Sequence, residues 1–134
     1  MSTLLLEIVT PERKVYEREV NMVLVKGVEG ELGILPKHIP MVTPLKIAPV
    51  RVKFGNEEEV IAVHGGFMEV GKDKVVILAE IAEVGGEIDL ERAEKAKKRA
   101  EERMKSKSSD TDLLRAEIAL QKSLMRIDTA RKRY

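Results

Sequence analysis

The chain has 134 residues, 24 basic and 23 acidic side chains and no cysteine. The lack of cysteine excludes disulfide bonds and thiolate chemistry, and the net charge of +1 gives no global attraction for nucleic acid. The first apolar run is too short for a secretory signal, and no stretch approaches the ~20 apolar residues of a membrane span. We therefore expect a soluble, cytosol-facing protein that does not span the membrane.

The two halves of the chain differ in charge. Residues 1–84 carry 10 basic and 13 acidic groups, a balance of −3, whereas residues 85–134 carry 14 basic and 10 acidic groups, a balance of +4. Two adjacent glycines, Gly85 and Gly86, supply a flexible joint at low steric cost. This contrast predicts two domains, residues 1–84 and residues 85–134.

In the first half, short apolar runs alternate with turn signals, which is typical of an all-β sandwich or barrel. No ten-residue window there has convincing helical periodicity, so we expect two packed sheets. The predicted strands cover residues 4–9, 20–26, 50–54, 59–64, 67–70 and 75–82, with the last two forming a hairpin across residues 71–73. Gly30 and Gly33 are predicted to bracket a tight loop, and Gly65-Gly66 to break a strand.

No pattern in this half indicates catalysis. The two histidines, His38 and His64, lie 26 residues apart, without a Ser/His/Asp constellation or a metal-ligand cluster. A lone histidine in a β domain is most often a surface or hydrogen-bonded structural residue. The paired glycines lack the surrounding pattern of a phosphate-binding loop. We therefore predict no catalytic residue and no metal site.

The second half predicts two helices. From Ile88 to about Lys105 there is no glycine or proline, strong helix formers dominate, and Asp89 can cap the start. A second helix is predicted from about Thr111 to Lys132, after a polar break with capping residues over residues 106–110. A short connection between two such helices predicts an antiparallel hairpin.

The apolar seam of this hairpin is thin. It consists of Ala93, Ala96, Ala100 and Met104 on the first helix, and of Leu113, Ala116, Leu120, Leu124, Ile127 and Ala130 on the second. Alanine buries little area at about 25 cal/mol/Å². We therefore expect a hairpin that is only marginally held shut.

Basic side chains form a stripe along each helix. The stripes are Arg92, Lys95, Arg99 and Arg103 on the first helix, and Arg115, Lys122, Arg126 and Arg133 on the second. In a closed hairpin the two stripes would flank one anionic site, suited to a polyphosphate or an acidic peptide. A solvated face with intrahelical pairs such as Asp89–Arg92 is the alternative, and spacing alone leaves both open.

Three segments, GELGILPKHIPMVTPL (30–45), GGFMEV (65–70) and KVVILAE (74–80), closely resemble the bacterial ATP synthase epsilon subunits. The resemblance covers nearly the whole chain, although His64 stands where serine is expected before the paired glycines. It implies a non-catalytic subunit, peripheral at the cytoplasmic face of the cell membrane. Its β-sandwich would bind the gamma subunit and the c-ring, with Glu31 and His38 facing the ring.

The resemblance also implies two arrangements of the helices, one packed on the sandwich and one extended into the catalytic alpha and beta subunits. In the extended arrangement Arg103, Arg115 and Lys122 would meet an acidic segment of the beta subunit and restrain ATP hydrolysis.

A subset of these subunits binds ATP through a motif of Ile or Leu, Asp, two variable residues, Arg and Ala, and residues 88–93 match it completely. The resemblance implies ATP as a regulatory ligand, not an obligatory cofactor. The implied contacts are Glu83, Ile88, Asp89, Arg92, Ala93, Arg99 and Arg126. Lys122 stands where arginine is usual in ATP-binding relatives, and lysine keeps the charge but loses the planar fork.

Three other functions remain open on the sequence. The chain could be a purely structural rotor subunit whose hairpin never moves. A nucleic-acid adaptor is disfavoured because acids interleave the basic stripes and only four aromatic residues are present. A small hydrolase is disfavoured because no nucleophile, base and orienting group can be assembled from the sequence.

Overall fold

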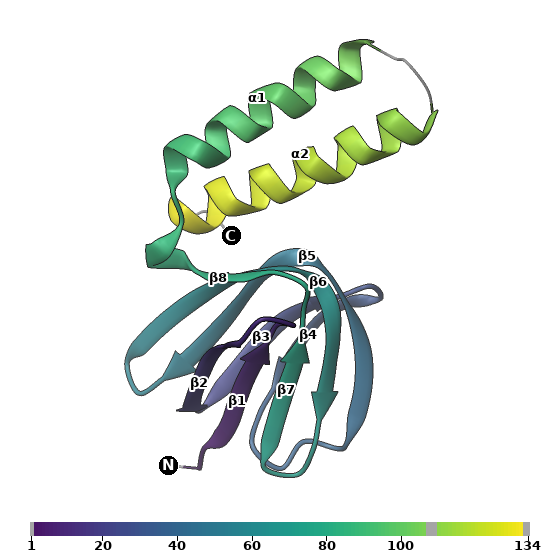
Figure 1. Ribbon diagram of the computed structural model, residues 1–134. Coiled ribbons are helices and arrows are strands. Elements are labelled where there is room, and N and C mark those ends of the chain that lie inside the picture. The colour runs from purple at the N-terminus through teal and green to yellow at the C-terminus, as the bar shows by residue number, and fades with distance from the viewer. Residues whose placement is uncertain (1, 107–109, 133–134) are drawn as a thin grey trace. The chain divides into compact units, whose positions relative to one another are not determined.

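The computed structural model describes residues 2–106 and 110–132. It divides into two compact units, Met1–Gly85 and Gly86–Tyr134. Figure 1 shows strands in the first unit and two long helices in the second. The predicted capping residues at 107–109, and Arg133 of the second basic stripe, lie outside the described residues.

The first unit is a β-sandwich in which hydrogen bonds join the described strands continuously, in the order β2-β1-β7-β6-β5-β3-β4, with β8 paired to β6. Neighbouring strands are antiparallel except β1 and β7, which are parallel. The strands are β1 (Leu4–Val9), β2 (Lys14–Val20), β3 (Met22–Gly27), β4 (Gly30–Ile34), β5 (Met41–Phe54), β6 (Glu57–Val70), β7 (Lys74–Leu78) and β8 (Ala82–Val84).

Alternation of apolar residues places one face of these strands in the core. In β1, Leu4, Leu6 and Ile8 are buried while the residues between them are only half-buried. The same period-2 pattern supplies fully buried Val23, Val52 and Ile61 from β3, β5 and β6. These side chains join one hydrophobic cluster that occupies the interior of the sandwich.

The prediction that Gly65-Gly66 breaks a strand is wrong, because β6 runs through both glycines. They have φ angles of +77° and +138°, and a Cβ atom on Gly66 would lie 2.1 Å from the carbonyl oxygen of Leu78. Only glycine tolerates this combination of positive φ and close backbone approach. The glycines mark the point where β6 changes neighbours, from β8 through Ile61–Val63 to β7 through Phe67–Val70.

Other strand predictions also need correction. The expected tight loop at Gly30 and Gly33 is strand β4, whose five residues pair in register with β3. Strand β2 was not predicted. The expected strand 50–54 is the end of the longer β5, and the expected strand 75–82 is divided into β7 and β8.

The second unit is an antiparallel helical hairpin, as predicted, formed by α1 (Leu90–Ser106) and α2 (Asp110–Ala130). A 3₁₀ turn, η1 (Gly85–Glu87), occupies the predicted glycine joint. The most buried residues of the predicted seam are Ala93, Ala100, Ala116 and Ile127, whereas Met104, Leu113 and Leu120 are half-buried. No helix among the described residues is long and apolar enough to cross a membrane.

Candidate functional site

The motif at residues 88–93 forms the start of α1. The Asp89 carboxylate accepts a hydrogen bond from the backbone N–H of Arg92 at 3.0 Å, and the backbone carbonyl of Asp89 accepts one from Ala93 at 3.0 Å. Asp89 is therefore the N-cap, as predicted, and satisfies an N–H group that has no partner within the helix. The alternative of a side-chain pair between Asp89 and Arg92 is replaced by this backbone contact.

The ion pair between Glu94 of α1 and Arg131, the residue after the end of α2, indicates the approximate register of the two helices. Because the helices are antiparallel, each step forward along α1 from Glu94 corresponds to a step backward along α2 from Arg131. Arg99 therefore lies at about the level of Arg126, and Arg103 at about the level of Lys122. By this count of residues, Arg99 and Arg126 share one level of the hairpin, and Arg103 and Lys122 share another level about one turn away.

These cationic levels lie along one edge of the seam. Arg99 is five positions after Glu94, and Arg126 is five positions before Arg131. At 3.6 residues per turn, each arginine therefore lies about 140° around its helix from the member of the ion pair on the same helix. The Glu94–Arg131 pair closes the other edge, where a pocket of about 510 Å³ is lined by both helices. This pocket contains Lys97, Lys98, Glu101, Leu124 and Ile127, and none of the predicted nucleotide residues.

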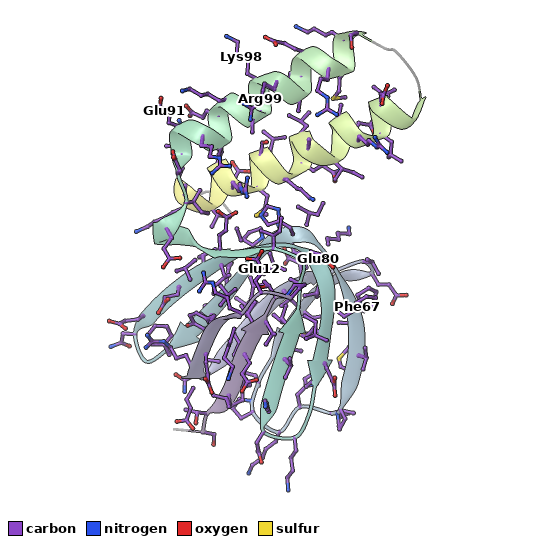
Figure 2. All side chains as sticks on the ribbon, viewed as in Figure 1. Glu12, Phe67, Glu80, Glu91, Lys98 and Arg99 are labelled. Atoms are coloured by element: carbon purple, nitrogen blue, oxygen red, sulfur yellow. The ribbon has the colours of Figure 1, made fainter. Side chains whose placement is uncertain are left out.

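The exposure of the basic stripe differs between the helices. Arg92, Arg99 and Arg103 on α1 and Arg115 on α2 are exposed, whereas Lys122 and Arg126 are half-buried. Figure 2 labels Arg99 next to Lys98, which is also exposed but belongs to the pocket edge. Of the predicted stripe, Lys95 pairs with Glu91 at 3.1 Å.

Glu83 belongs to the first unit, whereas the other predicted nucleotide residues belong to the second. It lies on β8, where its carboxylate Oε1 is 3.2 Å from Nε2 of His64. The His64 side chain is 1% exposed, so it is a buried, hydrogen-bonded residue, as the sequence predicted for a lone histidine. Sequence reasoning did not find its link to Glu83, because 19 residues separate the two.

A row of apolar side chains crosses the outer face of the sandwich. The strand register places Phe67 opposite Pro44 on one side and opposite Leu78 on the other, and Leu78 is opposite Val9. Phe67 and Leu78 are 56% and 49% exposed, and Figure 2 shows Phe67 on this sheet. A pocket of about 500 Å³ lies beside the row, next to the Gly65-Gly66 bend. Contiguous exposed apolar surface is a common feature of protein-contact sites.

The predicted ring-facing residues lie on and after β4. Glu31 is exposed on β4, and His38 is half-buried in the turn that follows it, with Nδ1 2.8 Å from the carbonyl oxygen of Ile39. Leu35 and Ile39 in the same segment are 54% and 79% exposed. The segment therefore offers apolar surface as well as the two predicted side chains.

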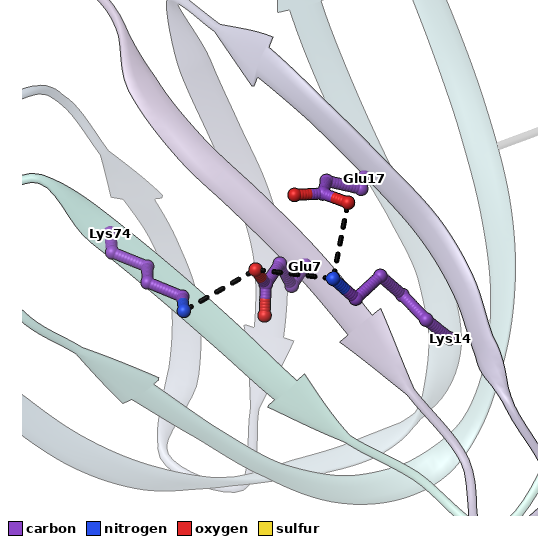
Figure 3. Close-up of polar contacts among 4 residues, drawn as sticks. All are labelled: Glu7, Lys14, Glu17 and Lys74. Atoms are coloured by element: carbon purple, nitrogen blue, oxygen red, sulfur yellow. Dashed lines mark hydrogen bonds and ion pairs between the residues drawn. The ribbon is translucent and has the colours of Figure 1, made fainter.

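A cluster of charges crosses β2, β1 and β7 on the outer face (Figure 3). Glu7 lies 3.3 Å from Lys74 and 3.5 Å from Lys14, which also pairs with Glu17 at 3.1 Å. Partial desolvation opposes ionisation of Glu7, but the two lysines outweigh it and lower the pKa of its carboxyl. The Lys14–Glu7 pair links the edge strand β2 to β1, and the Lys74–Glu7 pair links β7 to β1. Within the described residues, no group of three His, Cys, Asp or Glu side chains is arranged to hold a metal ion.

Comparison with known families identifies both units. Residues 3–85 match the β-sandwich domain of the ATP synthase delta/epsilon chain, and residues 87–131 match its long α-helix domain. The chain belongs to the ATP synthase delta/epsilon chain family. This membership agrees with the prediction of a subunit of a larger assembly that is not itself an enzyme.

Similar members of this family are bacterial. The ATP synthase epsilon chain of Halalkalibacterium halodurans is 53% identical over 97% of this chain and 98% of its own length. That of Bacillus licheniformis is 52% identical over 98% of this chain and 100% of its own length.

A solved structure supports the fold. A chain of the Euglena gracilis mitochondrial ATP synthase, determined with OSCP, F1 and the c-ring, has a TM-score of 0.81 at 24% identity. The match covers 92% of this chain and 79% of that one.

Proposed function

We propose that this chain is the epsilon subunit of a bacterial ATP synthase and that its helical hairpin senses ATP and restrains ATP hydrolysis. The family and its bacterial relatives support the first part. The observation that carries the second part is the pair of cationic levels, Arg99 with Arg126 and Arg103 with Lys122, on one edge of a thin seam.

Cationic side chains at the same level of a hairpin can bind one anion together through charge-assisted hydrogen bonds. The triphosphate of ATP is such an anion. In this proposal Arg92, Arg99 and Arg126 hold the phosphates, Ile88 supplies apolar contact before the start of α1, and Asp89 supplies an acceptor. ATP is a regulatory ligand in this scheme and not an obligatory cofactor.

The energetic scale fits a switch. A ligand at 100 times its dissociation constant stabilises the state that it binds by about 2.7 kcal/mol. Each buried alanine methyl of the seam contributes only about 0.8 kcal/mol. Bound ATP therefore adds as much stability to the closed hairpin as roughly three of its seam alanines. When ATP falls, the helices extend and restrain hydrolysis, with Arg103, Arg115 and Lys122 contacting an acidic surface of the catalytic subunits.

The β-sandwich is the proposed rotor contact. The apolar row of Phe67, Leu78 and Pro44 fits the gamma subunit, because a monomer rarely exposes such a row to water. The segment with Glu31, His38 and exposed Ile39 is the proposed contact with the c-ring, and a subunit held there would be peripheral at the cytoplasmic face of a membrane.

The ATP site is tested by isothermal titration of the full chain with MgATP. Arg99→Ala removes a charge-assisted contact and is expected to weaken binding about 10-fold or more. Lys98→Ala is the matched control, because it removes the adjacent exposed cation from the same helix; its affinity should stay within about twofold of the original chain.

Equal heats from the Arg99→Ala and Lys98→Ala variants would remove the assigned site. A chain that binds no nucleotide at all would leave a purely structural rotor subunit.

A further inference from the structure

Strand β2 stands at one end of the series of paired strands in the sandwich. Within the described residues it pairs with β1 alone, so its other side faces no strand. It has seven residues, whereas β4, at the other end of the series, has five. The outward backbone N–H and C=O groups of an edge strand can pair with an extended segment of another chain. The β2 edge is therefore a place where two copies of this chain could join their sheets.

Arg18 interrupts the apolar inner face of this edge strand. Residues directly opposite each other in an antiparallel pair lie on the same face of the sheet. The register of β1 and β2 places Arg18 opposite Leu6, which is fully buried. Tyr16 and Val20, two residues to either side of Arg18, are buried as well. Arg18 therefore puts a charge on the core side of the strand, where the neighbouring inward positions are apolar.

Contacts with β5 and β6 hold the Arg18 side chain at the rim of the core. Its Cζ atom lies 4.4 Å from the centre of the Phe54 ring, and its Nη2 atom lies 3.5 Å from Oε1 of Glu59. The Arg18 side chain is nevertheless 47% exposed. Exposed cation–π contacts and ion pairs of this kind contribute little to stability. Stability of the sandwich therefore does not account for a charge at this position.

We propose that Arg18 prevents the β2 edge from pairing with the same edge of a second copy of this chain. A strand added beside β2 would cover the rim of the core and remove the guanidinium from water. The pair with Glu59 does not offset this cost, because both groups would lose their hydration together. A charge that points inward on an edge strand blocks strand addition for this reason. The proposal is independent of the ATP site.

The position of Glu17 adds to this protection. Two copies that pair antiparallel along the whole of β2 are related by a twofold axis, which passes through the middle of the strand. Glu17 is the middle residue of β2, so this pairing places its carboxylate directly opposite that of the second copy. Like charges in directly opposite positions destabilise a strand pair.

The test is sedimentation velocity of the full chain over a range of protein concentrations. Arg18→Met removes the charge and keeps an unbranched side chain that can pack on Phe54, and thermal unfolding checks that the sandwich remains folded. We expect Arg18→Met to self-associate at least about tenfold more tightly than the original chain, since no guanidinium must be desolvated. Arg18→Lys keeps the inward charge and should behave like the original chain. Arg18→Thr, which favours strands, gives the same comparison if Arg18→Met does not fold.

Glu19→Met is the matched control, because Glu19 is an exposed charged residue of the same strand on the opposite face, across from Leu5. It should self-associate no more than the original chain. Amide hydrogen exchange locates the contact: β2 amides that point away from β1 should exchange more slowly in concentrated than in dilute Arg18→Met.

Four results would each overturn the proposal. They are a folded Arg18→Met or Arg18→Thr chain that self-associates no more than the original chain, an Arg18→Lys chain that associates as tightly as Arg18→Met, a Glu19→Met chain that does the same, and exchange protection on β4 or in the helices in place of β2.

Discussion

Ile127 is the most buried of the large side chains in the predicted seam of the hairpin. It is 4% exposed and lines the same pocket as Glu94 and Lys97 of α1. Replacing a buried isoleucine by alanine costs about 2–5 kcal/mol through lost transfer energy and the cavity left behind. The three buried alanines of the seam together contribute about 2.4 kcal/mol, at ~0.8 kcal/mol per methyl. Ile127→Ala should therefore open the hairpin.

The chain has no cysteine, so two can be introduced for spin labels without removing any. Glu102 on α1 and Gln121 on α2 are both exposed and suit this purpose. We expect a narrow distance distribution in the original chain and a broad distribution shifted to longer distances in Ile127→Ala. Leu114→Ala is the control, since Leu114 lies on the same helix and is 57% exposed.

The Leu114→Ala distribution should match that of the original chain. An unchanged distribution in Ile127→Ala would refute the inference that the seam is marginal. Addition of saturating MgATP to Ile127→Ala should restore the narrow distribution in part, because about 2.7 kcal/mol of ligand stabilisation is comparable to the energy lost.

Three further outcomes are expected. Gly66→Ala should lower the free energy of unfolding of the sandwich by more than ~3 kcal/mol or prevent folding, since Gly66 combines positive φ with the 2.1 Å approach to the carbonyl oxygen of Leu78. Gly55 has a φ of +60° but open space around it, so Gly55→Ala is the control and should lower the free energy of unfolding, measured in urea, by only about 1–2 kcal/mol. Asp89→Ala should remove about 1 kcal/mol of α1 stability, seen as faster amide exchange in its first turn, and unchanged exchange at Arg92 would contradict the cap. Lys74→Ala should raise the lowered pKa of Glu7 when it is followed by NMR titration. Because the folded-state pKa of Glu7 is lowered, its contribution to stability is present above its ordinary value of 4.5 and is lost as pH falls through the folded pKa. An unchanged pKa in Lys74→Ala would show that Lys74 is not its cause.

Local signals in the sequence were sufficient for several elements. Strand β1 has the predicted bounds because strict alternation at residues 4–9 needs no long-range information. Helices α1 and α2 were found within two residues at each end, since Asp89 is a strong cap and no glycine or proline interrupts either helix. The fold class followed from these elements.

Other elements depend on partners distant in sequence. Strand β2 carries mostly exposed charged residues, with Tyr16 and Val20 as its buried members, so its hydrophobic pattern is weak and its pairing with β1 defines it. Strand β4 contains two glycines that normally indicate a turn, but pairing with β3 keeps it extended. The course of β6 through Gly65-Gly66 is set by the close approach of β7.

The candidate site shows the same division. The cap at Asp89 was predicted from spacing within one turn. Placing Arg99 at the same level as Arg126 depends on the helix register that the Glu94–Arg131 pair indicates. The contact between His64 and Glu83 depends on the pairing of β6 with β8. Neither can be read from one helix or one strand alone.

The central claim is tested most directly by the ATP dependence of hydrolysis in an assembled ATP synthase that carries this subunit. With the original chain, hydrolysis should be restrained at low ATP and released as ATP rises. With Arg99→Ala, release should require a several-fold higher ATP concentration, whereas Lys98→Ala should behave like the original chain. Identical ATP dependence for the Arg99→Ala and original complexes would contradict the account.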